Sequence, residues 1–386
     1  MEDMKGKDIL FINGLFEDTI PGNFELIKDL MDLGHKVTCY IYDEFSEKYK
    51  DCGAKLKPYK IDKSDFNQFP PAVLEKASLS LTFTRAYIAI LSDALKSEEK
   101  YDYLLVDSYF DGVEMNKIFK IPTVISLYSS PIEIKTPFIE LTKQKRMRFL
   151  NQINEKFNIN IRDYLSIRHI ADAKFKLMLT SRLFHNDLKI LNDSFYFIGP
   201  YLEQKDKDKS FYFKKDENKK LINIYVFSLF NQNIDFYKMC VNVFGNSKEF
   251  QVIISVGEKV DIKKEFGDLP ENISIYNNVP QLEILPKTDV FITDSRMEAI
   301  ILGLFMNNLP LIVIKQENEY NNVKLIEKYE AGMSLNIQKL TNEALLESVN
   351  NFLSKKSKYQ IGVEKISKSF QEARNERKQI LEKIFA

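Results

Sequence analysis

The sequence has no tryptophan, and only three histidines and three cysteines among its 386 residues. Without tryptophan, no site in this chain can use an indole ring. An odd, low number of cysteines without zinc-type spacing fits a reducing cytoplasm. A mechanism that needs a histidine base is restricted to His35, His169 and His185.

Net charge and long apolar runs are also missing. Fifty-five Lys and Arg balance 55 Asp and Glu, which argues against a protein that coats nucleic acid. The longest uncharged apolar stretch, Ala299–Ile314, is interrupted by polar residues and is shorter than the roughly 20 residues of a spanning helix. The charged N-terminus leads directly into a strand-like run, so we expect no signal peptide and a soluble cytoplasmic protein.

Apolar runs that favour strands alternate with segments of helical periodicity. A strand at Asp8–Asn13, an amphipathic helix at Asn23–Leu33 and a strand at Lys36–Tyr42 form a βαβ unit. Further strands are predicted at Tyr103–Val106, Thr123–Leu127, Phe175–Thr180, Phe195–Ile198, Leu221–Phe227, Phe250–Ser255, Ile273–Tyr276, Val290–Thr293 and Leu309–Ile314. Further helices are predicted at Asp111–Phe119, Ile234–Phe244, Arg296–Phe305, Val323–Glu330, Thr341–Leu353 and Val363–Phe385.

This alternation predicts an α/β fold of two doubly wound, Rossmann-like halves that face a cleft, with ligands at the carboxyl ends of the strands. We expect an N-terminal domain at 1–204 and a C-terminal domain at 221–362. Between them, 205–220 is dense in charge of both signs and is interpreted as a linker, with a solvated surface loop as the alternative. The final helix, 363–386, is expected to pack back on the N-terminal domain.

Several local strings occur in a familiar order: LGHKV at Leu33–Val37, TSR at Thr180–Arg182 with FIGP at Phe197–Pro200, NVPQ at Asn278–Gln281, and the segment Phe291–Gln316. Together they resemble the GT-B glycosyltransferases of the macrolide glycosyltransferase type, over nearly the whole chain. The resemblance implies a UDP-sugar donor, a small lipophilic or natural-product acceptor, and neither a metal ion nor another cofactor.

On the acceptor side, the family's general base is a histidine after the first strand, and Thr19 occupies that position here. Threonine is no base at neutral pH, whereas Glu17 or Asp18 could serve if desolvation raised its pKa; both could equally be solvated loop acids. Asp107 matches the acid that orients the family histidine. It could act as the base itself or bond to the next helix. His35 lies at the opposite sheet edge, where we expect a structural role.

On the donor side, Ser228 matches the family turn after the first strand of the second half, but Phe230 replaces a glycine there. Asn278 stands where an aromatic ring stacks on uracil, and Val279–Gln281 follows unchanged. Base stacking contributes about 1–3 kcal/mol at nucleic-acid sites, so this replacement weakens donor binding. A tight loop without a ligand is the alternative interpretation of the segment.

Asp294, Ser295 and Arg296 replace the His-Gly-Gly that holds the donor diphosphate in the family. A carboxylate repels a diphosphate, whereas a guanidinium binds phosphate strongly. Asp294 is also a good N-cap for the helix that it precedes. Glu319 and Tyr320 correspond to the acid and amide that contact sugar hydroxyls, and only the acid is retained.

The ribose-binding glutamate of the family maps to Leu302 or Gly303, depending on one inserted residue, and neither side chain can hydrogen-bond. Two hypotheses follow. The first is a transferase that uses Asp107 or Asp18 as base and Arg296 for phosphate, with Phe138–Phe157 either facing the acceptor or forming a helical core. The second is a degenerate GT-B scaffold that serves as partner or stabilising subunit of another enzyme, as a homodimer or heteromer. A sugar-nucleotide epimerase is a third and less favoured reading.

Overall fold

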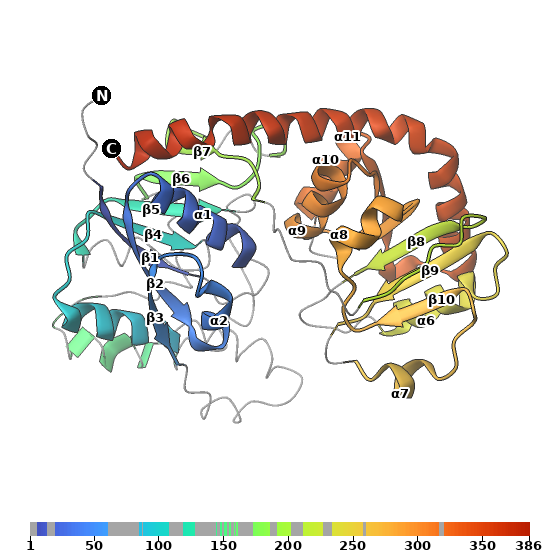
Figure 1. The fold of residues 1–386 in the computed structure, drawn as a ribbon, viewed down its shortest axis with the longest axis horizontal. Coiled ribbons are helices and arrows are strands. Elements are labelled where there is room, and N and C mark those ends of the chain that lie inside the picture. The colour runs from blue at the N-terminus through green and yellow to red at the C-terminus, as the bar shows by residue number, and fades with distance from the viewer. Residues whose placement is uncertain are drawn as a thin grey trace. The chain divides into compact units, whose positions relative to one another are not determined.

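The computed structural model describes residues 6–13, 20–60, 85–107 except 87, 119–127, 173–185, 191–201, 211–226, 234–257, 260–315 and 320–386, with scattered residues between 144 and 160. Contacts divide the chain into two compact units (Figure 1). The N-terminal unit comprises Met1–Thr180, Lys189–Tyr201 and Ala373–Ala386, and the C-terminal unit comprises Ser181–Leu188 and Leu202–Glu372.

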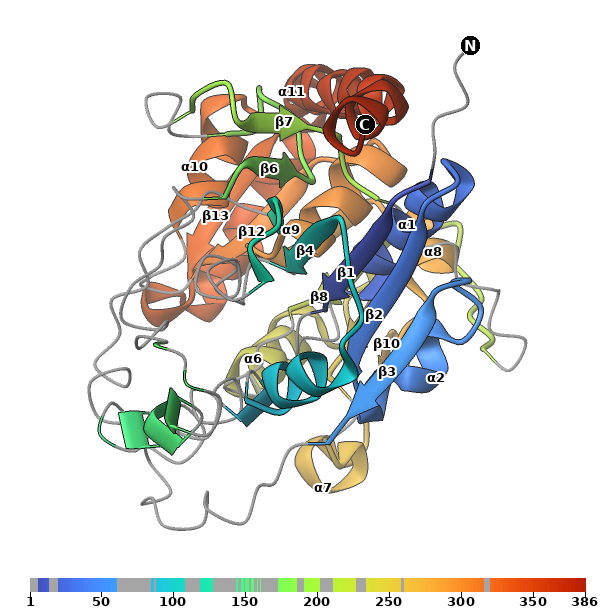
Figure 2. The same ribbon diagram turned by 90° about the vertical axis from the view of Figure 1, so that its left-hand side faces the viewer.

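The N-terminal unit contains a seven-stranded parallel sheet in the order β3-β2-β1-β4-β5-β6-β7 (Figure 2). Its strands are β1 (Asp8–Ile12), β2 (Lys36–Tyr42), β3 (Lys55–Tyr59), β4 (Tyr103–Asp107), β5 (Thr123–Leu127), β6 (Phe175–Met178) and β7 (Phe195–Phe197). The order reverses between β1 and β4, where Ile12 pairs with Val106. The carboxyl ends of these two strands therefore form the switch point at which doubly wound folds bind ligands.

Helix α1 (Ile20–Asp32) covers one face of this sheet and α2 (Ser46–Tyr49) follows β2. Leu26, Ile27 and Leu30 of α1 are fully buried in the same cluster as Ile9 and Phe11 of β1. The helix ends at Gly34, whose φ of 86° is the left-handed conformation that glycine adopts without strain. Burial on both faces explains why the strands read as continuous apolar runs instead of alternating patterns.

The C-terminal unit contains a six-stranded parallel sheet in the order β10-β9-β8-β11-β12-β13. Its strands are β8 (Lys220–Tyr225), β9 (Phe250–Ser255), β10 (Ile273–Tyr276), β11 (Val290–Asp294), β12 (Leu311–Lys315) and β13 (Gly332–Asn336). Its helices are α6 (Ile234–Phe244), α7 (Ile262–Phe266), α8 (Gln281–Ile284), α9 (Met297–Ile300) and α10 (Tyr320–Lys328). The switch point of this sheet lies between β8 and β11.

The predicted helix Arg296–Phe305 has a different form in the structure. The α-helical turn α9 continues as a π-helix over Ile301–Met306. Gly303 lies against β12, because a Cβ atom there would come within 2.2 Å of Leu311 Cδ2. A π-turn accommodates one residue more than an α-helical turn, which is how this segment absorbs the inserted residue.

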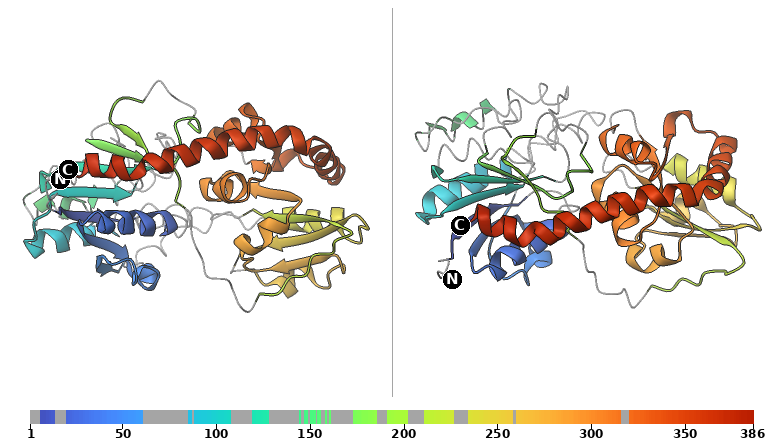
Figure 3. Two further views of the ribbon diagram at one scale, coloured as in Figure 1. Left: turned by 45° about the horizontal axis from the view of Figure 1, so that its top comes forward. Right: turned by 90° about the horizontal axis from the view of Figure 1, so that it is seen from above.

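The predicted helices Thr341–Leu353 and Val363–Phe385 are one helix, and their separation was wrong. Helix α11 runs without a break over Asn342–Ile384, 43 residues (Figure 3). Gly362 lies inside α11 at a close approach, because a Cβ atom there would lie 2.0 Å from the carbonyl oxygen of Tyr329. Thr341 caps the helix as predicted, since its Oγ1 accepts from the Ala344 N–H at 3.2 Å.

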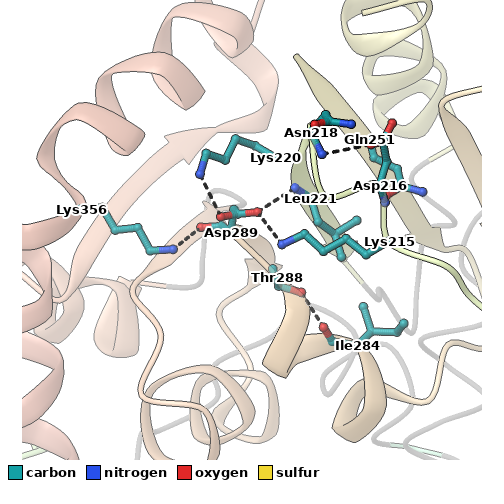
Figure 4. A network of polar contacts seen from close by, with 10 residues as sticks. All are labelled: Lys215, Asp216, Asn218, Lys220, Leu221, Gln251, Ile284, Thr288, Asp289 and Lys356. Atoms are coloured by element: carbon teal, nitrogen blue, oxygen red, sulfur yellow. Dashed lines mark hydrogen bonds and ion pairs between the residues drawn. The ribbon is translucent and has the colours of Figure 1, made fainter. Parts of the chain in front are cut away.

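The described part of the predicted linker, 211–219, lies along the C-terminal sheet (Figure 4). Lys215 Nζ is 3.1 Å from Asp289 Oδ2, and the same oxygen accepts from the Leu221 N–H at 2.9 Å. Lys356 of α11 donates to the carbonyl oxygen of Asp289 at 2.8 Å. Burial opposes ionisation of Asp289, but the Leu221 N–H and Lys215 outweigh it, so the pKa of Asp289 lies below its usual value.

Within the described residues, no helix is both long enough and apolar enough to cross a membrane. Two of the four edge strands, β3 and β13, were not predicted, whereas the edge strands β7 and β10 were. Strand β3 reads KLKPY, with lysines and a proline, a composition typical of exposed sheet edges and weak as a strand signal.

Candidate functional site

Four buried polar side chains meet at the switch point of the N-terminal sheet. Asn13 follows β1, Asn23 lies in the first turns of α1, Tyr49 ends α2 and Asp107 ends β4, and all four are 0% exposed. Asn23 Nδ2 donates to Asp107 Oδ2 and to Asn13 Oδ1, both at 2.6 Å. Asn13 Nδ2 donates to the Tyr49 hydroxyl at 2.9 Å. We call this set the amide–carboxylate chain.

Asp107 is the charged residue of the amide–carboxylate chain. A buried carboxylate is stable only with hydrogen-bond donors, and the Asn23 amide is one of them. Burial raises the pKa of the Tyr49 hydroxyl well above its usual value, so Tyr49 stays neutral. Asparagine does not ionise, which leaves Asp107 as the member of the amide–carboxylate chain that carries a charge and could act as a base.

Of the acceptor-side residues singled out in the sequence, Asp107 lies at this switch point, at the carboxyl end of β4. Asp18 and Thr19, like Glu17 beside them, fall outside the described residues. Asn13, Asn23 and Tyr49 were missed. The available signal was Asn23 itself, a polar residue on the helix face that otherwise carries Leu26, Ile27 and Leu30.

His35 takes the structural position that its sequence context suggested. It precedes β2 at the edge opposite the switch point, is 4% exposed, and its Nδ1 accepts from the Lys7 N–H at 3.2 Å. Burial, and then the nearby charge of Lys7, lower the pKa of His35. A neutral, buried imidazole at this edge stabilises the turn into β2 and lies away from the amide–carboxylate chain.

At the switch point of the C-terminal sheet, β8 and β11 end side by side. Thr293 Oγ1 donates to the carbonyl oxygen of Tyr225 at 2.9 Å. Arg296 Nε lies 2.9 Å from both carboxylate oxygens of Asp294, and its guanidinium carbon is 5.4 Å from the centre of the Tyr225 ring. Asn322 of α10 donates to the carbonyl oxygen of Ser295 at 3.0 Å. We call Asp294 and Arg296 the switch-point ion pair.

Asp294 was expected to be the N-cap of the following helix, but its side chain bonds before that helix begins. Its Oδ1 accepts from the Arg296 N–H at 3.0 Å, which forms an Asx turn ahead of α9 (Met297–Ile300). The side chains of Asp294 and Arg296 are 8% and 19% exposed, so the pair is shielded from water and stronger than a surface ion pair. The acid that would repel a diphosphate is therefore already neutralised by its neighbour two residues on.

The segment after β10 is held by a different amide contact. Gln281 Oε1 accepts from Asn223 Nδ2 of β8 at 2.8 Å, and both side chains are buried. Val279 is 2% exposed, whereas Asn278 is exposed. Gln281 thus anchors α8 to the sheet, and of these residues Asn278 is the one exposed to solvent.

The structure describes little of the remaining donor-side residues. Ser228 and Glu319 fall outside the described residues, and of Tyr320 only the backbone at the start of α10 is described. No group of three or more His, Cys, Asp and Glu side chains that could hold a metal ion occurs in the described part of the chain.

Two parallel sheets in Rossmann order, each with polar groups at its switch point, define the GT-B glycosyltransferase fold. The crystal structure of the glycotransferase of kitacinnamycin has this fold. It superimposes with a TM-score of 0.80 and 22% sequence identity, covering 99% of this chain and 100% of that one. The fold class predicted from the sequence is confirmed.

Sequence comparisons identify related proteins with known family descriptions. Residues 261–373, which include the switch-point ion pair, match the family described as UDP-glucoronosyl and UDP-glucosyl transferase. The chain is 28% identical over 364 residues to NDP-glycosyltransferase YjiC of Bacillus licheniformis, covering 90% of this chain and 89% of that protein. It is 28% identical over 130 residues to oleandomycin glycosyltransferase of Streptomyces antibioticus, covering 33% and 30%. The chain is therefore related to the NDP-dependent and macrolide glycosyltransferases with the GT-B fold.

Proposed function

We propose that this protein transfers a sugar from a nucleoside-diphosphate donor, a UDP-sugar, to a small lipophilic or natural-product acceptor. The observation that carries the proposal is the family match over residues 261–373, which includes the end of β11 at the C-terminal switch point and the paired Arg296. Helix and strand ends at such switch points are the usual sites for phosphorylated ligands. The C-terminal unit is assigned to the donor and the N-terminal unit to the acceptor.

In the donor unit, Arg296 and Ser295 are assigned to the diphosphate, with Asp294 shaping the turn. A diphosphate carries more negative charge than one carboxylate, so it competes with Asp294 for the guanidinium. Asn278, Val279 and Gln281 are assigned to the side of the base, through the Val279 backbone and with Gln281 as the anchor. Ser228, Glu319 and Tyr320 complete the donor assignment on the family pattern.

In the acceptor unit, Asp107 is assigned as the base, with Asp18 and Thr19 on the preceding loop. The Asp107 carboxylate takes the proton of the acceptor hydroxyl, and the hydroxyl oxygen attacks the anomeric carbon of the sugar. The bond from that carbon to the diphosphate breaks, and its electron pair leaves on the nucleoside diphosphate. General-base catalysis of this kind contributes about 10²–10⁴-fold in rate.

Thermal unfolding with and without nucleotide tests the donor assignment. A ligand that binds only the native state stabilises by about 2.7 kcal/mol at a hundred times its Kd, so UDP, UDP-glucose and dTDP-glucose at about millimolar concentration should raise the Tm. Release of UDP in the presence of 4-methylumbelliferone, a small phenol, then tests turnover. A flat melting curve with all three nucleotides contradicts the proposal.

A second candidate function is that of a GT-B scaffold that acts as partner or stabilising subunit of another enzyme. It is favoured by the pairing of Arg296 with Asp294, which satisfies within the chain a cation that a donor would otherwise bind. This candidate predicts no shift with any nucleotide. It also predicts a stable complex with a second protein when the chain is purified from its own cell.

A further inference from the structure

Asn23 is an unusual residue for its position. It lies on the buried face of α1, 0% exposed, among residues that are otherwise apolar. Burying an amide costs free energy unless its hydrogen bonds are made. A leucine of similar shape would pack there, but it would remove a hydrogen-bond donor from the buried Asp107 carboxylate, so the role of Asn23 is tied to Asp107.

The hydrogen bonds of the amide–carboxylate chain determine which way the Asn23 amide faces. Its nitrogen donates to two oxygens, Asn13 Oδ1 and Asp107 Oδ2, each at 2.6 Å. If the amide were turned over, its oxygen would face both of these oxygens. Asn13 is held in turn by its own bonds, from Nδ2 to the Tyr49 hydroxyl at 2.9 Å and from its N–H to the Tyr40 carbonyl oxygen at 3.2 Å. Contacts with β2 and α2 therefore fix Asn13 at the end of β1, and Asn13 in turn orients the Asn23 N–H groups toward Asp107.

We propose that Asn23 is a positioning residue for Asp107, and that through it α1 holds the carboxylate ready to accept a proton from an acceptor hydroxyl. This inference rests on the proposed transferase function. In the family that this sequence resembles, the acid at the position of Asp107 is paired with a histidine, and that histidine is the base. Here its partner of known geometry is an amide, which orients the acid but cannot accept the proton.

The pairing also favours one class of acceptor. A carboxylate is ordinarily a weaker base than an imidazole, by about two pKa units, and a donated hydrogen bond stabilises its ionised form further. A weak base deprotonates a phenol more readily than an aliphatic alcohol, because the phenol is more acidic. The acceptors that fit an Asn23-bound Asp107 are therefore phenols and other acidic hydroxyls.

Steady-state kinetics with UDP-glucose and two acceptors test the role of Asn23. The acceptors are 4-methylumbelliferone and an aliphatic alcohol of similar size, such as cyclohexylmethanol. The variants are Asn23→Leu, which keeps the shape and removes the donor, and Asn23→Ser, which restores one donor. Lys28→Gln is the control, because it changes an exposed residue of the same helix and leaves every member of the amide–carboxylate chain in place. A UDP-induced rise in Tm shows that each variant has a folded donor unit.

We expect Asn23→Leu to lower kcat about 100-fold with little change in the acceptor KM, the size typical of a misplaced catalytic group. The acid limb of its pH–rate profile should move to higher pH, because the ionised carboxylate has lost a donor. Asn23→Ser should recover part of the loss, and Lys28→Gln should keep the kcat and the pH–rate profile of the wild type. The wild type should prefer the phenol to the alcohol.

Two results overturn the inference, and they can be told apart. If the wild type turns over and Asn23→Leu matches it in kcat and pH profile, the positioning role is wrong while the transferase function stands. If the wild type turns over no sugar with either acceptor, both are wrong. Should Asn23→Leu fail to fold, Asn23→Ser gives the same comparison, since it loses one of the two donated bonds.

Discussion

The two switch points of this protein occupy the same place in two sheets of the same strand order, yet they are built from opposite chemistry. In the N-terminal unit, neutral amides surround one carboxylate, so the four residues of the amide–carboxylate chain carry a formal charge of −1. In the C-terminal unit, a carboxylate and a guanidinium face each other, so their charges cancel. A site that retains a negative charge can accept a proton, whereas a site that presents a cation with a replaceable counter-charge can bind an anion.

The difference teaches that the topology provides the location and the strand ends provide the chemistry. Both sheets bring the carboxyl ends of their two central strands together because the strand order reverses there. Nothing in that topology requires an amide in one sheet and an ion pair in the other. The predictions that follow test whether the two switch points really differ in this way.

The largest expected effect is on the acceptor unit. Asp107→Asn should lower kcat with an aliphatic acceptor about 10³-fold, because the general base is removed while the shape is kept. The loss should be much smaller with 4-methylumbelliferone at about pH 9, where the phenol is already largely ionised and needs no base. Initial rates with both acceptors are the measurement. Equal losses with both acceptors would contradict a base at this position.

The next effect is on the donor unit. Arg296→Met should destabilise the protein by about 3 kcal/mol, because it leaves the buried Asp294 carboxylate without its guanidinium. It should also weaken UDP binding, whereas Asp294→Asn should strengthen UDP binding about tenfold by removing the competing charge. Calorimetric titration with UDP measures both. Equal UDP affinity in the two variants would remove Arg296 from the diphosphate site.

A smaller effect is expected on stability, and it comes from packing and not from catalysis. Gly362→Ala should destabilise the protein by about 2 kcal/mol, because the new Cβ would lie 2.0 Å from the Tyr329 carbonyl oxygen and α11 would have to move. Ile361→Ala, at an adjacent side chain that is 72% exposed, is the control and should have almost no effect. Thermal unfolding of both variants is the measurement, and similar Tm values for the two would contradict the close approach.

The smallest effect compares the pH dependence of the two units. The pKa of His35 is lowered in the folded state, so the unfolded chain binds more protons below about pH 6.5 and stability falls as the pH falls through that range. His35→Gln should remove this loss, which we expect to be about 2 °C in Tm. Asp289→Asn is the counterpart in the C-terminal unit. The pKa of Asp289 is also lowered, so its stabilisation is complete above about pH 4 and is lost only below it. A wild-type Tm that is flat from pH 7 to pH 5 would contradict the first half of this prediction.

Much of the fold could be read from local pattern. Apolar runs such as Lys36–Tyr42, Thr123–Leu127 and Phe250–Ser255 are strands with the bounds predicted, because a strand buried on both faces is a short, nearly continuous apolar run. Local pattern was insufficient where contacts with residues distant in the sequence determine the structure. Gly362 favours a break in isolation, but it lies inside α11 because the helix passes close to Tyr329. The edge strands β3 and β13 carry too few apolar residues to be recognised without the sheet beside them.

The sequence by itself determined the alternation of strands and helices, the relationship to glycosyltransferases, and the presence of Asp107, Asp294 and Arg296 at strand ends. Only the tertiary structure decided what those groups touch. Asn23 reaches Asp107 across 84 positions, and Asn223 reaches Gln281 across 58. Periodicity reports which face of an element is buried, since it depends on residues a few positions apart. The partner that meets that face depends on strand order and register, which form only when the whole sheet is assembled.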